Sequence, residues 1–148
     1  MATSIVAMED NIKALIQSVT SNITVYDPDD MLELTAHIAP PFVGLVYLGL
    51  DPNGLDKEGR SAKMMFGIYI LGTKKNLTSK KNCPTTQEGV SEADLVSITQ
   101  FLQDLREAIG GQTAPSMHKW QLRTERPYTF DDKGIGYHQV WQATVQSI

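Results

Sequence analysis

Two uninterrupted apolar runs constrain the fold of this chain more than any other feature. Residues 42–50 (FVGLVYLGL) and residues 64–71 (MMFGIYIL) are short and rich in residues that favour β-strands. Strands that are apolar on consecutive residues must be covered on both faces. A polar connection that contains the turn pair Asn53-Gly54 separates the runs, so the simplest arrangement is an antiparallel hairpin. The two runs therefore predict the centre of a sheet.

Two segments have the periodicity of amphipathic helices. In residues 4–19 the apolar side chains, Ile5 among them, recur every three or four positions. Residues 91–109 show the same spacing and begin with SEAD, which matches a capping box. Gly110-Gly111 then supplies a left-handed stop after this second helix. The sequence predicts one helix before the apolar runs and one after them.

The C-terminal part alternates between apolar and polar residues. Residues 120–125 and 137–146 have period two, with a turn near 132–134, which is typical of half-buried strands. The predicted order is helix, strand, strand, helix, strand, strand. This order indicates an α+β fold, with an antiparallel sheet of about four strands and two main helices packed on one face. Residues 1–148 form a single domain, as expected at this length.

Two helices can cover only one face of such a sheet. The other face is covered either by loops and residues 31–38 of the same chain, or by another subunit. We favour self-association from the continuous apolarity of the two central strands.

Composition and residue spacing argue against several classes of function. The net charge of −4 argues against free nucleic acid as the main ligand, which requires a basic surface. The single cysteine, Cys83, permits no internal disulfide, and His37, His118 and His138 have no metal-ligand spacing. We expect no metal and no cofactor. The first 17 residues lack a basic start and a continuous apolar run, so we expect neither a signal peptide nor a membrane span.

One stretch imitates a nucleotide-binding motif. Residues 54–61 (GLDKEGRS) fit the phosphate-loop spacing G-x-x-x-x-G-K-[ST], except that Arg60 replaces the lysine. A phosphate loop opens a helix, whose N-terminus adds positive potential, but a β-rich run follows here. We interpret the stretch as a hairpin loop. No nucleophile elbow is present, and the acid pairs are typical of solvated carboxylates, so we predict that the protein is not an enzyme.

A second basic stretch lies in residues 73–90, a long polar connection that contains KKNLTSKK. It has the charge of a phosphate-binding patch but no interleaved aromatic residue to stack on bases. It is either a solvated mobile loop or a docking loop for an acidic protein or nucleic-acid surface.

The order of these segments resembles the tail terminator (tail completion) proteins of tailed bacteriophages. The resemblance covers nearly the whole chain and is one of pattern, without a catalytic motif. The segments that carry it are IVAMEDNIKALIQ, PPFVGLVYLGL, MMFGIYILG, EADLVSITQFLQDLREAIGG and the closing pair WQLRTERPYTF...GIGYHQVWQATVQ. The closing pair, with its tryptophan-containing strand, charged middle and aromatic-rich last strand, is the most specific part.

The resemblance implies a structural virion protein that forms a hexameric ring with a central channel. The ring would end the tail tube and join it to the head-side connector, with DNA passing through without specific binding. The implied partners are further copies of the chain, the tail tube protein and the connector, with the tail sheath as a further partner and no membrane. The protein would be assembled in the host cytoplasm and located in the virion.

No catalytic residue is carried over from this family. We predict assembly contacts in the 73–90 connection and in the hairpin tip at 53–61. The candidate residues are Lys57, Arg60, Lys74, Lys75, Lys80 and Lys81. The acidic balance of the chain fits a channel that must release DNA, because carboxylates repel phosphates.

Three alternatives remain at the level of sequence. Other head–tail neck proteins have a similar order of elements. A small enzyme would have a pocket with convergent polar groups and would carry a ligand or metal through purification. A monomeric α+β binding module would run as a single 16.4 kDa species.

Overall fold

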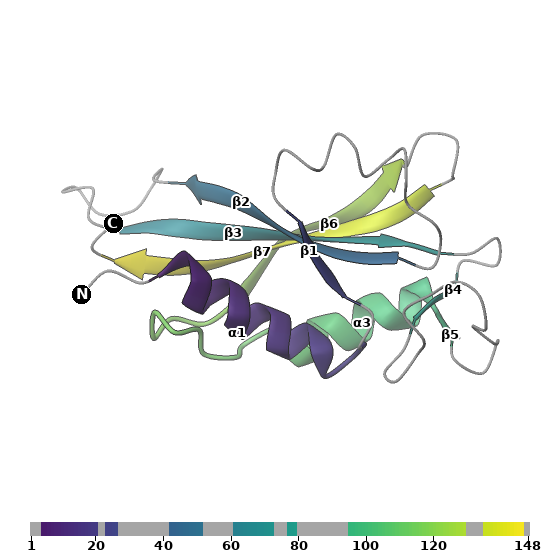
Figure 1. Ribbon diagram of the computed structural model, residues 1–148, viewed down its shortest axis with the longest axis horizontal. Helices are drawn as coiled ribbons and strands as arrows, with labels where there is room; N and C mark the ends of the chain where they lie inside the picture. Colours follow the sequence, from purple (N-terminus) through teal and green to yellow (C-terminus); the bar gives the residue numbers. More distant parts are fainter. Residues whose placement is uncertain are drawn as a thin grey trace.

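A computed structural model describes most of the chain, in seven segments. The described residues are 4–20, 23–26, 42–51, 61–72, 77–79, 95–129 and 135–146. Figure 1 shows the elements, which in chain order are α1 (Ile5–Gln17), β1 (Thr24–Tyr26), β2 (Phe42–Asp51), β3 (Ser61–Leu71), β4 (Leu77–Ser79), β5 (Leu95–Ser97), α3 (Ile98–Ile109), β6 (Gln121–Thr129) and β7 (Ile135–Gln146).

The main sheet has the strand order β1-β2-β3-β7-β6. Its four long strands are antiparallel to their neighbours, and short β1 is added in parallel at the edge beside β2. The two apolar runs are paired as an antiparallel hairpin, with Leu45 opposite Ile68. The last strand, β7, lies between β3 and β6, so the C-terminal hairpin joins the sheet through its second strand. The α+β prediction is confirmed for the described residues.

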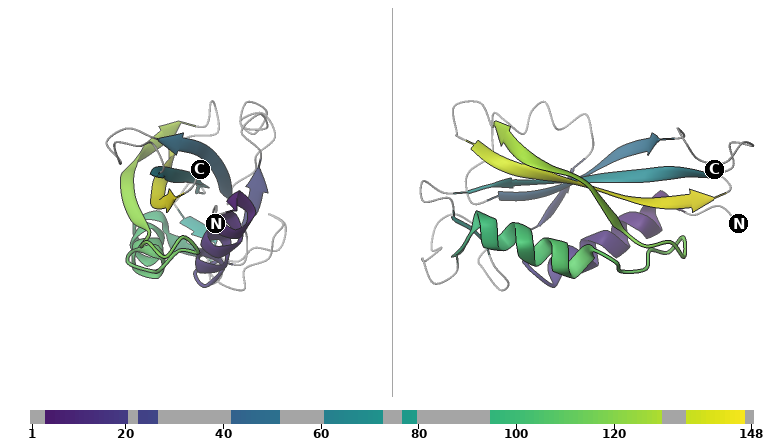
Figure 2. Two further views of the ribbon diagram at one scale, coloured as in Figure 1. Left: turned by 90° about the vertical axis from the view of Figure 1, so that its left-hand side faces the viewer. Right: turned by 180° about the vertical axis from the view of Figure 1, so that it is seen from behind.

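Both helices pack on one face of this sheet (Figures 1 and 2). The core between the layers contains alternate residues of β3, which are Ala62, Met64, Phe66, Ile68 and Ile70. The buried residues of the helices are Met8, Ile12 and Ile16 of α1, and Ile98, Phe101, Leu102, Leu105 and Ile109 of α3. Within each of these two stripes the buried residues recur every three to four positions, and this spacing is why the sequence predicts helices here.

Helix α3 begins later than the sequence predicts. Leu95–Ser97 is strand β5, and the helix starts at Ile98, where the Ser97 hydroxyl accepts a hydrogen bond from the Gln100 amide at 3.2 Å. The chain offers two capping-box spacings, Ser91 with Asp94 and Ser97 with Gln100. The prediction of helix from residue 91 is wrong at 95–97, because β5 pairs antiparallel with β4. Ser91 itself lies outside the described residues.

The same pairing corrects the interpretation of residues 73–90 as a continuous loop. Residues 77–79 form strand β4, which makes a two-stranded sheet with β5 beside the start of α3. The remainder of that segment, apart from these three residues, lies outside the described residues.

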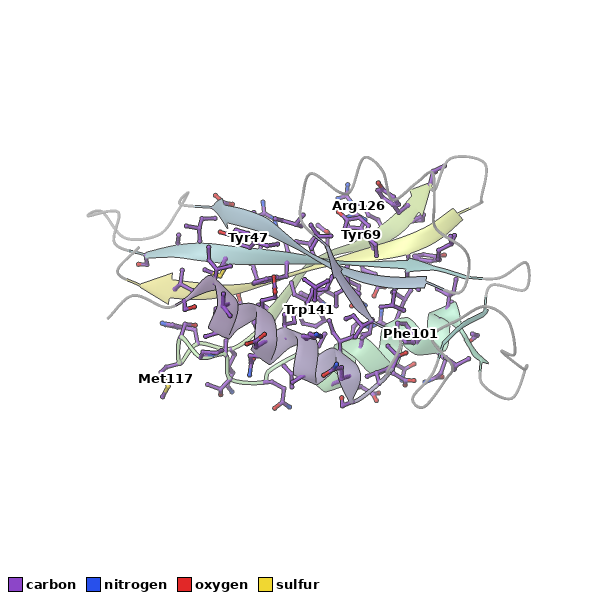
Figure 3. All side chains as sticks on the ribbon, in the orientation of Figure 1. Tyr47, Tyr69, Phe101, Met117, Arg126 and Trp141 are labelled. Atoms are coloured by element: carbon purple, nitrogen blue, oxygen red, sulfur yellow. The ribbon has the colours of Figure 1, made fainter. Side chains whose placement is uncertain are left out.

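The face of the main sheet opposite the helices is also largely buried. Val46 and Leu71 are each 1% exposed, and Tyr69 is 8% exposed. The Tyr69 ring lies so close over Gly67 that a Cβ there would stand 2.9 Å from it. Figure 3 shows Tyr69 and Arg126 on this side of the sheet and Phe101 on the helix side. At these residues one chain buries its own sheet, so the argument that a second subunit must cover this face does not hold there.

The sheet is also strongly curved, as the end-on view in Figure 2 shows. Arg123 of β6 makes a 2.9 Å ion pair with Asp51 of β2, although β7 and β3 lie between these strands. The Arg123 guanidinium also lies 3.1 Å from the sulfur of Met65, on the way across β3. The face opposite the helices is therefore concave where Arg123 reaches across the sheet to Asp51. In the described part of the chain, no helix has the length and apolarity needed to cross a bilayer.

Candidate functional site

The six basic residues predicted as assembly contacts, Lys57, Arg60, Lys74, Lys75, Lys80 and Lys81, lie outside the described residues. The structure does describe the strands that flank them. β2 ends and β3 begins at the left of Figure 1, whereas β3 ends and β4 lies at the right. The two basic segments thus leave from opposite ends of the molecule.

The structure places a strand directly after the stretch that resembles a phosphate loop. Residues 54–60 lie outside the described residues, and Ser61 begins the eleven-residue strand β3. A phosphate loop requires a helix N-terminus at this point. The interpretation of the stretch as a connection between two strands agrees with the flanking structure.

The exposed large apolar side chains of the described residues come from three segments at one end of the molecule, although Leu48 lies beside Gly67 on the face opposite the helices. The large apolar residues with substantial exposure are Ile5 (44%), Val6 (65%), Leu48 (37%), Leu50 (39%) and Met117 (82%). They come from the start of α1, the end of β2 and the connection between α3 and β6. All three segments lie at the left of Figure 1, and the end-on view of Figure 2 faces them. We call these five residues the apolar end.

Met117 stands at the tip of an ordered hairpin, which we call the 111–120 hairpin. The Trp120 amide donates to the Gln112 carbonyl at 2.9 Å, and the Ala114 amide donates to the His118 carbonyl at 2.8 Å. The Met117 amide closes the turn on the Ala114 carbonyl at 2.9 Å. Pro115 takes the second position of this turn, where its fixed φ is favourable.

Met117 is unfavourable at its position for two separate reasons. Its φ is 71°, and it is the one residue other than glycine with a positive φ among the described residues. Glycine is usual after a type I turn in a hairpin of this kind, and a side chain there costs roughly 1–2 kcal/mol. The side chain is also apolar and mostly in water, pointing away from the body of the molecule (Figure 3). Local strain of this kind is most often kept where it has a function.

The 111–120 hairpin is fixed to helix α1. The indole Nε1 of Trp120 donates to Asn11 Oδ1 at 2.8 Å, and Trp120 is only 1% exposed. The Trp120 ring also packs edge-on against Phe66, with the ring centroids 5.9 Å apart. Because Asn11 belongs to α1, the hydrogen bond holds Met117 in a defined position relative to Ile5 and Val6, which are also on α1.

The charges around the apolar end are divided between its parts. The hairpin carries the exposed residues His118 and Lys119, and no acidic residue occurs from 110 to 124. On α1, Asp10 is exposed and lies one turn after Val6. The apolar end thus combines a basic projection with an apolar patch that has an acidic neighbour.

A separate group of aromatic rings occupies the face opposite the helices. Tyr69 and His138 are stacked, with centroids 5.2 Å apart and planes at 8°, and Tyr128 contacts both rings edge-on. Burial, and then the nearby charge of Arg126, lower the pKa of His138. Burial, and then Tyr128, raise the pKa of Tyr69. The His138 Nδ1 atom is buried without a hydrogen-bond partner. The described residues contain no group of three or more side chains that could hold a metal ion.

A polar chain that is buried at Trp141 and Gln139 connects α3 to the C-terminal strands. The Trp141 indole donates to Gln139 Oε1 at 2.8 Å, and Gln139 Nε2 donates to Glu125 Oε1 at 2.7 Å and to the Leu102 carbonyl at 3.2 Å. Arg106 completes the chain with an ion pair to the Glu125 carboxylate. Because each buried group has a partner, we assign this chain the structural role of positioning α3 on the sheet.

Sequence reasoning missed the most exposed part of this surface. In the sequence, the proline in TAPSMHK is the one local signal of this hairpin, and it marks a turn, not a site. The sequence predicts Ile5 in the buried stripe of its helix, but it is 44% exposed, and the buried residues of α1 begin at Met8. No protein-family model matches this chain, and no curated protein matches it at a significant level. Function must therefore be inferred from the residues of this chain and their arrangement.

Proposed function

We propose that this chain is a structural subunit of a tailed bacteriophage, acting as a tail terminator without catalytic activity. It forms a ring, with hexameric symmetry, that ends the tail tube and joins it to the head-side connector. Its partners are further copies of itself, the tube protein and the connector. DNA passes through the channel without specific binding. The subunit is assembled in the host cytoplasm and is part of the virion.

The apolar end is the observation that carries this proposal. Single exposed apolar residues are ordinary on protein surfaces. Here the five most exposed large ones of the described residues come from three segments at one end, and one of them has a positive φ. Exposed apolar side chains at one end make this part of the described surface the best suited to contact with another protein.

The arrangement of the chain around this end supports the same proposal. The order of helices and long strands agrees with the pattern on which the family resemblance rests. The face of the sheet opposite the helices is buried at Val46 and Leu71, so the apolar end is the better candidate for contact with other subunits. The net charge of −4 favours passage of DNA over retention, because excess carboxylates repel phosphates.

The test is capping of tail tubes. Tubes assembled from the tube protein of a tailed phage are mixed with this protein and imaged in negative stain. Sizing chromatography of the protein alone is run at several concentrations. We expect rings at one end of each tube, and tubes that stop growing. A protein that remains a single 16.4 kDa species and leaves tube ends bare would contradict the proposal.

A matched pair of variants connects this test to the apolar end. Val6→Ser removes an exposed apolar side chain from α1, and we expect it to weaken capping. Ala14→Ser is the control, since residue 14 is also exposed on α1 but lies about two turns away from the apolar end. Equal capping by both variants would show that α1 does not contribute through this end.

A further inference from the structure

The apolar end carries two surfaces of complementary chemistry on the same chain. The tip of the 111–120 hairpin combines the apolar Met117 with Lys119, and both side chains are exposed. The first two turns of α1 combine Ile5 and Val6 with the exposed Asp10. The Trp120–Asn11 hydrogen bond holds one surface beside the other. Each copy of the chain therefore presents both a basic projection with an apolar tip and an apolar patch with an acidic neighbour.

We propose that the hairpin tip of one copy packs on the start of α1 of a second copy. Met117 lies against Ile5 and Val6 of the other copy, and Lys119 faces its Asp10. The chemistry of the contact is an apolar anchor with a charged pair at its rim. The partner is thus a second copy of this chain.

Three features favour a second copy over a different protein. The charges are opposite in sign, with the basic Lys119 at the tip and the acidic Asp10 beside the apolar patch. Both halves of the contact belong to one sequence, so association of identical copies buries Met117, Ile5 and Val6 together. The hairpin is ordered by its own hydrogen bonds and anchored by Trp120, so little freedom is lost when the tip is buried.

This inference rests on the proposed function in one respect, because it names the contact between neighbouring subunits of the ring. The contact itself does not fix the symmetry. A contact repeated head to tail gives a ring when the rotation closes, and a contact made twice about a two-fold axis gives a pair. The stoichiometry of the associated species therefore tests the ring, and the residues in the contact test this inference.

The first experiment measures self-association of Met117 variants by sedimentation, alone and on tube ends. Met117→Gly and Met117→Asn both remove the apolar anchor, and both residues accept a positive φ. We expect each to weaken association by about tenfold or more, as for an anchor side chain. We expect the melting temperature of the free Met117→Gly subunit to equal or exceed that of the wild type. Met117→Leu keeps the apolar anchor and is the control, and it should associate like the wild type.

The second experiment exchanges the rim charges. Lys119→Glu and Asp10→Lys should each weaken association when purified alone. The double variant, or an equimolar mixture of the two single variants, should recover it, because opposite charges again face each other across the contact. If either single variant associated weakly because it was misfolded, neither the double variant nor the mixture would recover association.

The outcomes separate this inference from the proposed function. Unchanged association of Met117→Gly, or failure of the charge exchange to restore association, overturns the inference. Loss of tube capping by Met117→Gly, with no self-association of the wild type even on tubes, assigns the tip to the tube protein and also overturns it. A wild-type pair that depends on Met117 and never closes into rings supports the inference and contradicts the ring.

Discussion

At the scale of single residues, His138 is the titratable group with the clearest environment. Its ring is stacked on Tyr69, contacts Tyr128 and lies near Arg126, and its Nδ1 atom has no hydrogen-bond partner. A proton on this ring would lose hydration and would be repelled by the Arg126 guanidinium. Both effects lower the pKa of His138 below its usual 6.5 in the folded protein.

The first prediction follows from the direction of this pKa shift. Between the lowered folded pKa and about 6.5, the unfolded chain binds more protons at this position, so the free energy of unfolding rises with pH in this window. Stability should therefore fall as the pH is lowered below about 6.5, with a slope from this group of at most about 1.4 kcal/mol per pH unit. Urea unfolding of the wild type and of His138→Gln at several pH values measures the effect.

The variant provides the comparison. The difference in unfolding free energy between wild type and His138→Gln should be constant above pH 7 and should change progressively below about pH 6.5, in favour of the variant. A difference that stays constant from pH 8 to well below this range would show that His138 is not desolvated as described.

At the scale of elements, the start of α3 illustrates how tertiary pairing selects between two local signals. Both Ser91 and Ser97 begin a capping-box spacing, and Leu95 and Val96 suit either a helix or a strand. The pairing of β5 with β4 selects the strand, which leaves Ser97 as the cap. Residues 77–79, which make that pairing, form a strand of only three residues inside a polar segment. Nothing in the sequence therefore marks them as a strand.

The second prediction tests which serine caps the helix. Ser97→Ala removes the acceptor for the Gln100 amide and should cost about 0.5–2 kcal/mol of unfolding free energy. Ser91→Ala is the matched comparison and should lack this cost, because the helix begins at Ile98. Chemical denaturation of both variants measures the two unfolding free energies. A larger loss in Ser91→Ala than in Ser97→Ala would place the cap at Ser91.

At the scale of the whole molecule, the two faces of the sheet have different coverings. The helices cover one face with the stripes of α1 and α3, and the other face is buried at Val46, Tyr69, Leu71 and Val140 within the same chain. Continuous apolarity in the two central strands thus reflects burial on both faces of one subunit. Association with other copies, which we propose, uses the apolar end.

The third prediction separates burial within one chain from burial between chains. Leu71 is 1% exposed, so Leu71→Ala should cost about 2–5 kcal/mol of unfolding free energy. Because the side chain is buried in the single subunit, this cost should be independent of protein concentration. Thermal unfolding of wild type and variant over a wide concentration range provides the measurement. A cost that grows with concentration would mean that a second subunit covers this face.

Local patterns in the sequence are sufficient to predict most of the helices and long strands. Periodicity placed α1 and all of α3 except its start, continuous apolarity placed β2 and β3, and alternation indicated the C-terminal strands, because each pattern reports which side of an element meets the core. In β6 a register shift between Leu122 and Thr124 interrupts the expected alternation. The turn pair in the connection after residue 51 was enough to predict that β2 and β3 pair antiparallel. The fold class could be read from these signals alone.

The strand order, the start of α3 and the composition of the apolar end depend on tertiary packing. Placement of β7 between β3 and β6, and of β1 beside β2, depends on long-range pairing that no local pattern encodes. The exposure of Ile5 depends on how α1 packs against the rest of the molecule, and the positive φ of Met117 depends on a hairpin closed by backbone hydrogen bonds. A side-chain pattern records burial on one element, whereas a surface assembled from three elements exists only after they have packed.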